Sequence, residues 1–261
     1  MERIPVTLSQ DEIPSLFSYY LDHATVYDSS CSCDAKVYYL DNGPGYYLKT
    51  APKHSLKMEA QMTEFFHKKS LGPQVLAYES TDRDWLLTQR IPGEDCIWQP
   101  YLDCPVKLCD TLATLLRMLH GTDATGCPVT NRTADYLACA NHNCLTQKYD
   151  ASKFPGYRGF TSAAEAWNVV QDGARYLKAD VLIHGDYCLP NIILNQWKFS
   201  GFIDLGFGGI GDLHIDLYWA VWSLWYNLKT DKYTDRFLDA YGRDRVEPEL
   251  LRTVAAIEVF G

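Results

Sequence analysis

The sequence predicts an α+β protein with a small antiparallel-sheet part followed by a larger, mainly helical part. The first 90 or so residues alternate β-branched and aromatic runs with turn residues around a single helical segment. After that point apolar side chains recur at helical spacing. With 261 residues and 47% hydrophobic content, the chain can bury a core in each part. We therefore expect two domains, 1–91 and 92–261.

The first part predicts a hairpin, a helix and two further strands. Segments 35–40 and 45–50 flank Asp41-Asn42-Gly43-Pro44, a strong turn signal. Segment 57–69 has the periodicity of a helix and stops before Gly72-Pro73. Segments 73–78 and 85–89 then resemble strands on either side of a turn at 80–84. In the second part, a stripe of leucines predicts a core helix that ends at His120: Leu108, Leu112, Leu115, Leu116 and Leu119.

The segment His184 to Asn191, HGDYCLPN, carries the most chemistry in the chain. Apolar runs at 181–183, 192–194 and 199–203, with a polar turn at 195–196, predict a strand and then a hairpin that ends at Asp204. A hairpin of that length would place Asp204 beside Asn191. A carboxylate and an amide oxygen suit Mg²⁺. Asp186 would then face an acceptor hydroxyl as the catalytic base.

Two neighbours of this segment are expected to support it. We interpret His184 as a scaffold residue, because Asp186 already serves as the proton acceptor. Asp216 begins a helical, aromatic segment at 217–228 and could accept backbone N–H bonds from the catalytic loop. The tryptophans of that segment are expected in the core, with one of them possible in a substrate cleft: Trp219, Trp222 and Trp225.

A cationic side chain on the predicted hairpin suits nucleotide phosphates. Lys49 lies on the second strand and Glu59 on the following helix, the arrangement in which kinases hold the α- and β-phosphates of ATP. Glu64 lies on the same helix, but the helix register sets Glu59 nearer the strand.

The motifs together resemble the aminoglycoside phosphotransferases, and most closely their 3′-phosphotransferase group. HGDYCLPNIIL and FIDLGFGGIGDLHIDLYWAV carry the resemblance, which extends from AKVYYL near residue 35 to the terminal IEVFG. It implies a two-lobed, protein-kinase-like fold and ATP-dependent (or GTP-dependent) O-phosphorylation of an aminoglycoside, a small cationic antibiotic, at its 3′-hydroxyl. It also implies Mg²⁺ held by Asn191 and Asp204.

The resemblance extends to the nucleotide site and breaks down at the substrate site. The family's phosphate loop suggests contacts from Ser32 and Cys33, although a plain polar turn would look the same, and backbone at Gln89 and Ile91 would bind adenine. Phe207 stands where the family has an arginine, and acidic residues that line its substrate site are missing. The remaining candidates for substrate binding are Asp150, Glu258 and the terminal carboxylate beside Phe260.

Composition agrees with this assignment. A net charge of −9 disfavours nucleic acid and anionic membranes as partners and favours cationic ligands. No apolar run approaches the roughly 20 residues of a membrane span and no signal peptide is evident, so we expect a cytoplasmic protein. Nine cysteines without a C-x-x-C pair disfavour a zinc site or a disulfide framework. The sequence leaves the oligomeric state open.

Three other functions remain open. The first is a kinase of the same fold that acts on another amino alcohol or sugar, such as choline, a ribose or a fructosamine. The second is a pseudokinase, which the presence of Lys49, Asp186, Asn191 and Asp204 together disfavours. The third is a metal-dependent hydrolase, but such sites usually need more histidine ligands than this segment offers.

Overall fold

The chain forms two compact units in the computed structural model, which describes residues 4–8, 13–30, 35–156 and 158–261. The first, the sheet unit, comprises Met1–Glu94 and Ile193–Gly206. The second, the helical unit, comprises Asp95–Ile192 and Phe207–Gly261. The expected division after residue 91 did not include the return of residues 193–206 to the first unit. Phe202 anchors this return, because its N–H donates to the carbonyl of Leu71 at 2.7 Å and its ring packs edge-on to Phe66.

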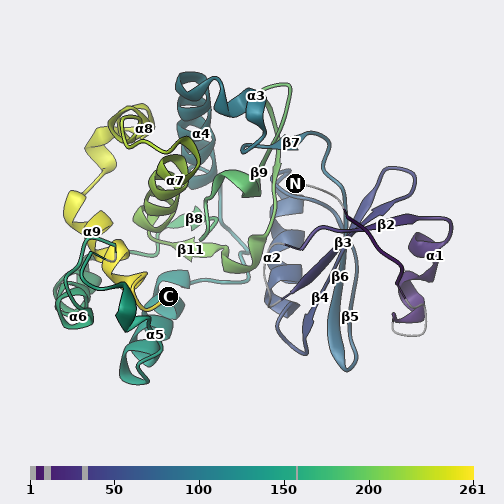
Figure 1. The fold of residues 1–261 in the computed structure, drawn as a ribbon, viewed down its shortest axis with the longest axis horizontal. Helices are drawn as coiled ribbons and strands as arrows, with labels where there is room; N and C mark the ends of the chain where they lie inside the picture. The colour runs from purple at the N-terminus through teal and green to yellow at the C-terminus, as the bar shows by residue number, and fades with distance from the viewer. Residues whose placement is uncertain (1–3, 9–12, 31–34, 157) are drawn as a thin grey trace. The chain divides into compact units, whose positions relative to one another are not determined.

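The sheet unit is built on six antiparallel strands in the order β1-β2-β3-β4-β6-β5 (Figure 1). Their bounds are β1 Ile4–Pro5, β2 Thr25–Asp28, β3 Lys36–Asp41, β4 Tyr46–Pro52, β5 Val75–Ser80 and β6 Arg83–Gln89. Helix α2, Lys57–Lys68, packs against β5. The predicted hairpin, helix and two strands are thereby confirmed, whereas β1, β2 and the short α1, Ser18–Leu21, were not predicted.

The alternation of side chains along β4 decides which residues meet α2. Leu48 pairs in register with Leu87, and both are buried in a cluster on one face of the sheet. Lys49 pairs with Leu86, which belongs to the cluster that includes Ala60 of α2. Because successive side chains on a strand point to opposite faces, Lys49 lies on the α2 face.

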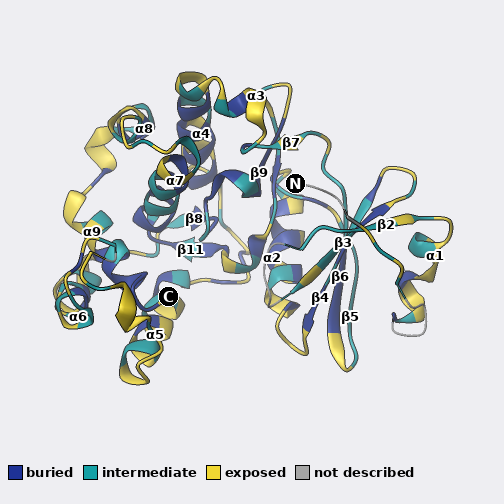
Figure 2. Cartoon of the chain, in the orientation of Figure 1, coloured by how far each residue is buried: buried dark blue, intermediate teal, exposed yellow. Residues whose placement is uncertain are grey.

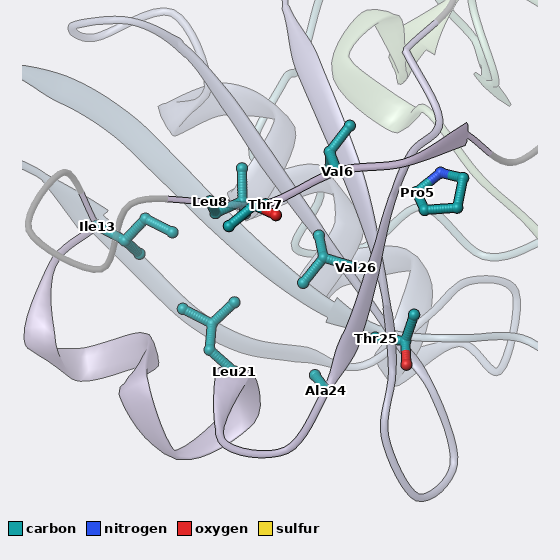
Figure 3. A pocket seen from close by; sticks show the side chains of 9 residues that line it. All are labelled: Pro5, Val6, Thr7, Leu8, Ile13, Leu21, Ala24, Thr25 and Val26. Atoms are coloured by element: carbon teal, nitrogen blue, oxygen red, sulfur yellow. The ribbon is translucent and has the colours of Figure 1, made fainter.

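A hollow of about 440 Å³ lies beside the β1–β2 edge of the sheet unit (Figure 3). Nine residues line it: Pro5, Val6, Thr7, Leu8, Ile13, Leu21, Ala24, Thr25 and Val26. None of these nine described side chains is ionisable.

The helical unit contains seven α-helices within the described residues. They are α3 Gln99–Leu102, α4 Pro105–His120, α5 Arg132–Leu145, α6 Ala163–Gly173, α7 Leu213–Leu228, α8 Thr234–Tyr241 and α9 Pro248–Ile257. Helix α4 packs on α7 and α8, and α6 packs on α9 (Figure 1). The predicted leucine stripe is confirmed as the buried face of α4, which Figure 2 shows in dark blue.

Short strands precede and follow the predicted catalytic segment along the chain. Strand β8, Val181–Ile183, confirms the predicted strand before His184 and pairs antiparallel with β11, Gly209–Gly211. The 3₁₀ turn η5, Leu189–Asn191, ends the segment, and the predicted hairpin follows as β9, Ile192–Asn195, and β10, Lys198–Phe202. Strand β7, Glu94–Asp95, extends the same small sheet. Across the described parts of the chain, no helix combines the length and apolar character needed to cross a lipid bilayer.

Candidate active site

In the sheet unit one ammonium group connects two carboxylates. Lys49 Nζ donates to both carboxylate oxygens of Glu59, at 2.9 and 2.8 Å, and to Asp204 Oδ1 at 2.9 Å. Glu64, the alternative partner on α2, instead pairs with Lys68 on the exposed side of the helix. The structure therefore brings together Lys49, Glu59 and Asp204, three residues selected from the sequence.

Burial and charge act in opposite directions on this cluster. Burial disfavours the charged form of Lys49, but the carboxylates of Glu59 and Asp204 outweigh it and raise the pKa of the Lys49 ammonium. Burial also raises the pKa of the Glu59 carboxyl, and Lys49 partly offsets that rise. The ammonium group is thus held charged, as binding of nucleotide phosphates requires.

Asp204 follows β10 at a turn that aims its side chain at Lys49. Its backbone is left-handed, with φ of 58°, a conformation that aspartate tolerates better than most residues. Only Oδ1 contacts Lys49, and the side chain remains 51% exposed. Oδ2 accepts no hydrogen bond from the described residues, so it stays available for an external ligand.

The two residues predicted to bind adenine through their backbone differ in whether those backbone groups are already hydrogen-bonded. The N–H of Gln89 donates to the carbonyl of Gln74 at 3.0 Å and is used within the protein. Ile91 lies beyond the end of β6, and neither its N–H nor its carbonyl bonds to any described residue. Ser32 and Cys33, the expected phosphate contacts, lie outside the described residues.

In the helical unit the Asp216 carboxylate binds two backbone N–H groups at the start of the predicted catalytic segment. Its Oδ2 accepts from the backbone N–H of His184 at 2.8 Å, and its Oδ1 accepts from that of Gly185 at 2.7 Å. Gly185 has φ of 82°, and a Cβ there would lie 2.0 Å from the carbonyl oxygen of Phe207. Only glycine therefore fits between this carboxylate and the next segment.

His120 completes the support and was not recognised from the sequence. It does end α4 as predicted, but its ring is buried between Asp216 Oδ2, 3.1 Å from Nε2, and the hydroxyl of Tyr241, 2.8 Å from Nδ1. A histidine at a helix end gives no sign of a partner 96 residues away in the chain. His184 is also fully buried, and its Nδ1 lies 3.3 Å from the backbone nitrogen of Asp186, which donates to it.

Asp186 and Asn191 form a hydrogen-bonded pair at the two ends of the loop. Asn191 Nδ2 donates to Asp186 Oδ2 at 2.9 Å and to the Asp186 carbonyl at 3.0 Å. With its NH₂ group used in this way, the amide presents Oδ1, which accepts no hydrogen bond from the described residues. An amide oxygen on Asn191 and a carboxylate oxygen on Asp204 are the hard donors that Mg²⁺ prefers, so the donor set fits this ion. Within the described ranges, no three His, Cys, Asp or Glu side chains cluster as a metal site of their own.

Asp186 and Asn191 both line a cavity of about 830 Å³ that lies within the helical unit. One wall is the aromatic face of α7, formed by Trp219, Trp222 and Tyr226. The rings of Trp222 and Tyr226 are stacked, with centroids 5.0 Å apart and planes at 11°. A cavity of this size accommodates a small molecule.

The family model of the phosphotransferase enzyme family matches residues 32–251 of the chain. The chain belongs to this family. A probable aminoglycoside 3′-phosphotransferase of Lactococcus lactis subsp. lactis (strain IL1403) is 42% identical over 252 residues, which cover 96% of each chain.

Two solved structures share the fold of this family member. One is an aminoglycoside-3′-phosphotransferase of type VIII, with a TM-score of 0.74 at 23% identity over 97% of this chain and 96% of that chain. The other is an aminoglycoside phosphotransferase of Streptomyces rimosus in complex with ADP and streptomycin, with a TM-score of 0.69 at 22% identity over 86% and 90%. The kinase-like α+β fold and the family resemblance predicted from the sequence are thereby confirmed.

The predicted substrate residues of this family member are in different environments. Glu258 is buried and lines the cavity. Asp150 is outside the lining, because its carboxylate caps the 3₁₀ turn η3, Ala151–Lys153. The ring of Phe260 is also outside it, fully buried against Tyr149 and Trp167. Gly261, the predicted position of the terminal carboxylate beside Phe260, does line the cavity.

Several cavity residues were not selected from the sequence. Asp135, Tyr136 and Arg158 line the cavity, but they come from α5 and from the loop before α6, for which no element was predicted. Of the three tryptophans expected in the core, Trp219 and Trp222 are half-buried in the cavity wall. The expectation was wrong for Trp225, which is 50% exposed, because α7 is apolar on more faces than its neighbours cover.

Proposed function

We propose that the protein transfers the γ-phosphate of ATP (or GTP) to the 3′-hydroxyl of an aminoglycoside antibiotic and thereby confers resistance in the cytoplasm. The observation that carries the proposal is Asp186, whose carboxylate is held by Asn191 on the wall of the 830 Å³ cavity. Support comes from the family and from the relatives, which are named for this reaction or, in one case, bound to ADP and streptomycin.

The residues of the sheet unit bind the nucleotide in this proposal. Lys49, kept charged by Glu59, neutralises the α- and β-phosphates. The backbone of Ile91 offers adenine one donor and one acceptor. Gln89, whose N–H is used, contributes at most its remaining backbone group. Ser32 and Cys33 remain proposed contacts of the phosphate-covering loop.

Asn191 and Asp204 would hold Mg²⁺ through Oδ1 and Oδ2, respectively. When bound, the ion neutralises charge on the transferring phosphoryl group. Lys49 contacts the other oxygen of Asp204, which keeps that carboxylate oriented.

Asp186 acts on the acceptor hydroxyl. Phosphoryl transfer passes through a loose transition state, so positioning of the hydroxyl contributes more than its early deprotonation. The Asp186 carboxylate accepts a hydrogen bond from the hydroxyl, orients its lone pair and receives the proton as the O–P bond forms. Asp216 and His120 keep the loop in place, and Asn191 fixes the carboxylate.

A coupled ADP-release assay with kanamycin B and tobramycin tests the proposal, because these two aminoglycosides differ only in the presence of the 3′-hydroxyl. We expect turnover with kanamycin B and none with tobramycin above the rate with ATP alone. Equal turnover of both compounds would refute the 3′-position, and turnover of neither would refute aminoglycosides as substrates.

A second candidate is a kinase of the same fold that phosphorylates another amino alcohol or sugar. The observation that favours it is the composition of the cavity wall, where three aromatic side chains of α7 face the space and two carboxylates are paired with arginines. The same assay with choline, ribose and a fructosamine distinguishes this candidate, since activity above that with any aminoglycoside would favour it.

A further inference from the structure

Both guanidinium groups that line the cavity are paired with carboxylates of the protein. Three carboxylate side chains and two guanidinium groups line it: Asp135, Asp186, Glu258, Arg132 and Arg158. Gly261, where the sequence predicts the terminal carboxylate, lines it as well. Arg132 Nη1 lies 3.5 Å from Asp135 at the exposed rim, and Arg158 Nη2 lies 3.7 Å from Glu258. Among the described residues, neither Asp186 nor the predicted terminal carboxylate at Gly261 has a cationic partner. Two of the carboxylates that a substrate with several ammonium groups would meet are thus already paired with arginines.

Glu258 is a buried carboxylate whose oxygens already have partners within the protein. Its side chain is 7% exposed, and it accepts a short hydrogen bond from the hydroxyl of Tyr136. Burial raises the pKa of its carboxyl to about 7, while Tyr136 and Arg158 favour the ionised form. A carboxylate so placed would bind a substrate ammonium strongly if that position were open.

Arg158 is held where it is by more than this ion pair. Its guanidinium lies over the rings of Trp219 and Tyr218, with centroids 5.4 and 5.6 Å away, and Nη1 donates to the hydroxyl of Tyr218. Its side chain is 15% exposed. A planar, weakly hydrated guanidinium is well suited to such stacking. Displacing it would cost the ion pair, the hydrogen bond and two ring contacts together.

We propose that Arg158 determines substrate specificity: it occupies the ammonium position at Glu258, and the cavity therefore selects an acceptor that presents a hydroxyl there. The aromatic wall of α7 receives the ring face of that acceptor. The inference deepens the proposed function and uses aminoglycosides as its probes.

Two matched pairs of aminoglycosides test this role. Neomycin B and paromomycin I differ only in an amino or a hydroxyl group at position 6′, and kanamycin B and kanamycin A differ in the same way at position 2′. Each pair is compared in the wild type, in Arg158→Gln, which removes the charge, and in Arg158→Lys, which keeps a cation but not the planar fork. Calorimetric binding without nucleotide and KM under turnover are both measured at pH 8, above the pKa of about 7 that Glu258 has with Arg158 in place.

We expect Arg158→Gln to favour the amino member of at least one pair by about tenfold in Kd and KM relative to its hydroxyl partner, the scale of one charge-assisted hydrogen bond. That gain should diminish in 0.5 M salt, as an ammonium–carboxylate contact would. Arg158→Lys should keep the wild-type ratio within about twofold. The melting temperature and the KM for ATP confirm that each variant is folded.

Unchanged amino-to-hydroxyl ratios in both pairs would overturn the inference. So would a loss of affinity for every aminoglycoside in Arg158→Gln, because Arg158 would then hold the cavity open for substrate. If the binding ratio shifts as expected but no variant releases ADP with any aminoglycoside, the proposed function fails and the role of Arg158 stands.

Discussion

Replacement of Asp216 by asparagine tests how the catalytic loop is held. Asp216 is fully buried and accepts from three donors: the backbone N–H groups of His184 and Gly185 and the ring of His120. An amide has one acceptor oxygen, so its NH₂ group must face at least one of these donors. Each hydrogen bond to a charged group contributes about 1.5–3 kcal/mol, and loss of one or two predicts ~1.5–6 kcal/mol less stability.

The effect on catalysis should exceed the effect on nucleotide binding. A shifted loop misplaces Asp186, and a misplacement of about 1 Å can lower kcat by about a hundredfold. Asp212→Asn is the matched control, because Asp212 is equally buried at the start of α7 but accepts from Lys178 and His214, outside the loop. Denaturant unfolding and steady-state kinetics are measured for both variants. A folded Asp216→Asn protein with wild-type kcat, or an equal loss of kcat in Asp212→Asn, would refute the reasoning.

Three further predictions follow from the two units. Asp186→Ala should lower kcat by at least about a hundredfold with nucleotide binding near normal, as single-turnover kinetics can check. Asp204→Ala should abolish, and Asn191→Ala weaken, the dependence of nucleotide affinity on Mg²⁺, since a carboxylate holds the ion more strongly than an amide; equal and metal-independent affinities in titrations would contradict this. The pKa of Glu258 is raised from 4.5 to about 7, so its contribution to stability is complete below pH 4.5 and lost as the pH rises through 7. Between pH 5 and 8 the free energy of unfolding of the wild type should therefore fall by ~3 kcal/mol relative to Glu258→Gln, and parallel pH profiles would argue against it.

The parts of the site that the sequence predicted are those with a local signature. Lys49 on a strand and Glu59 on the next helix follow from two periodicities, and Asp186 and Asn191 lie within one loop. The same periodicities predicted the hairpin, α2 and the buried face of α4.

The parts that could not be predicted depend on contacts between distant segments. Nothing near His120 indicates Asp216, and nothing near Arg158 indicates Glu258, because only the tertiary fold brings the two members of each pair together. Asp150 looked like a substrate ligand because it is acidic and lies in a loop, yet its carboxylate satisfies the backbone N–H of Ser152. An acidic residue at the start of a turn is more often a cap than a ligand.

The return of residues 193–206 to the sheet unit also affects how the chain must fold during synthesis. The first 94 residues emerge from the ribosome well before Phe202 is translated. The ring of Phe202 contacts Phe66, and its N–H bonds to Leu71. The first unit therefore cannot be completed, and Phe66 and Leu71 lack their contacts with Phe202, until about a hundred further residues have been translated. Domains usually fold in order from the N-terminus, but here completion of the first unit depends on a late segment. The two units consequently mature in an interleaved order.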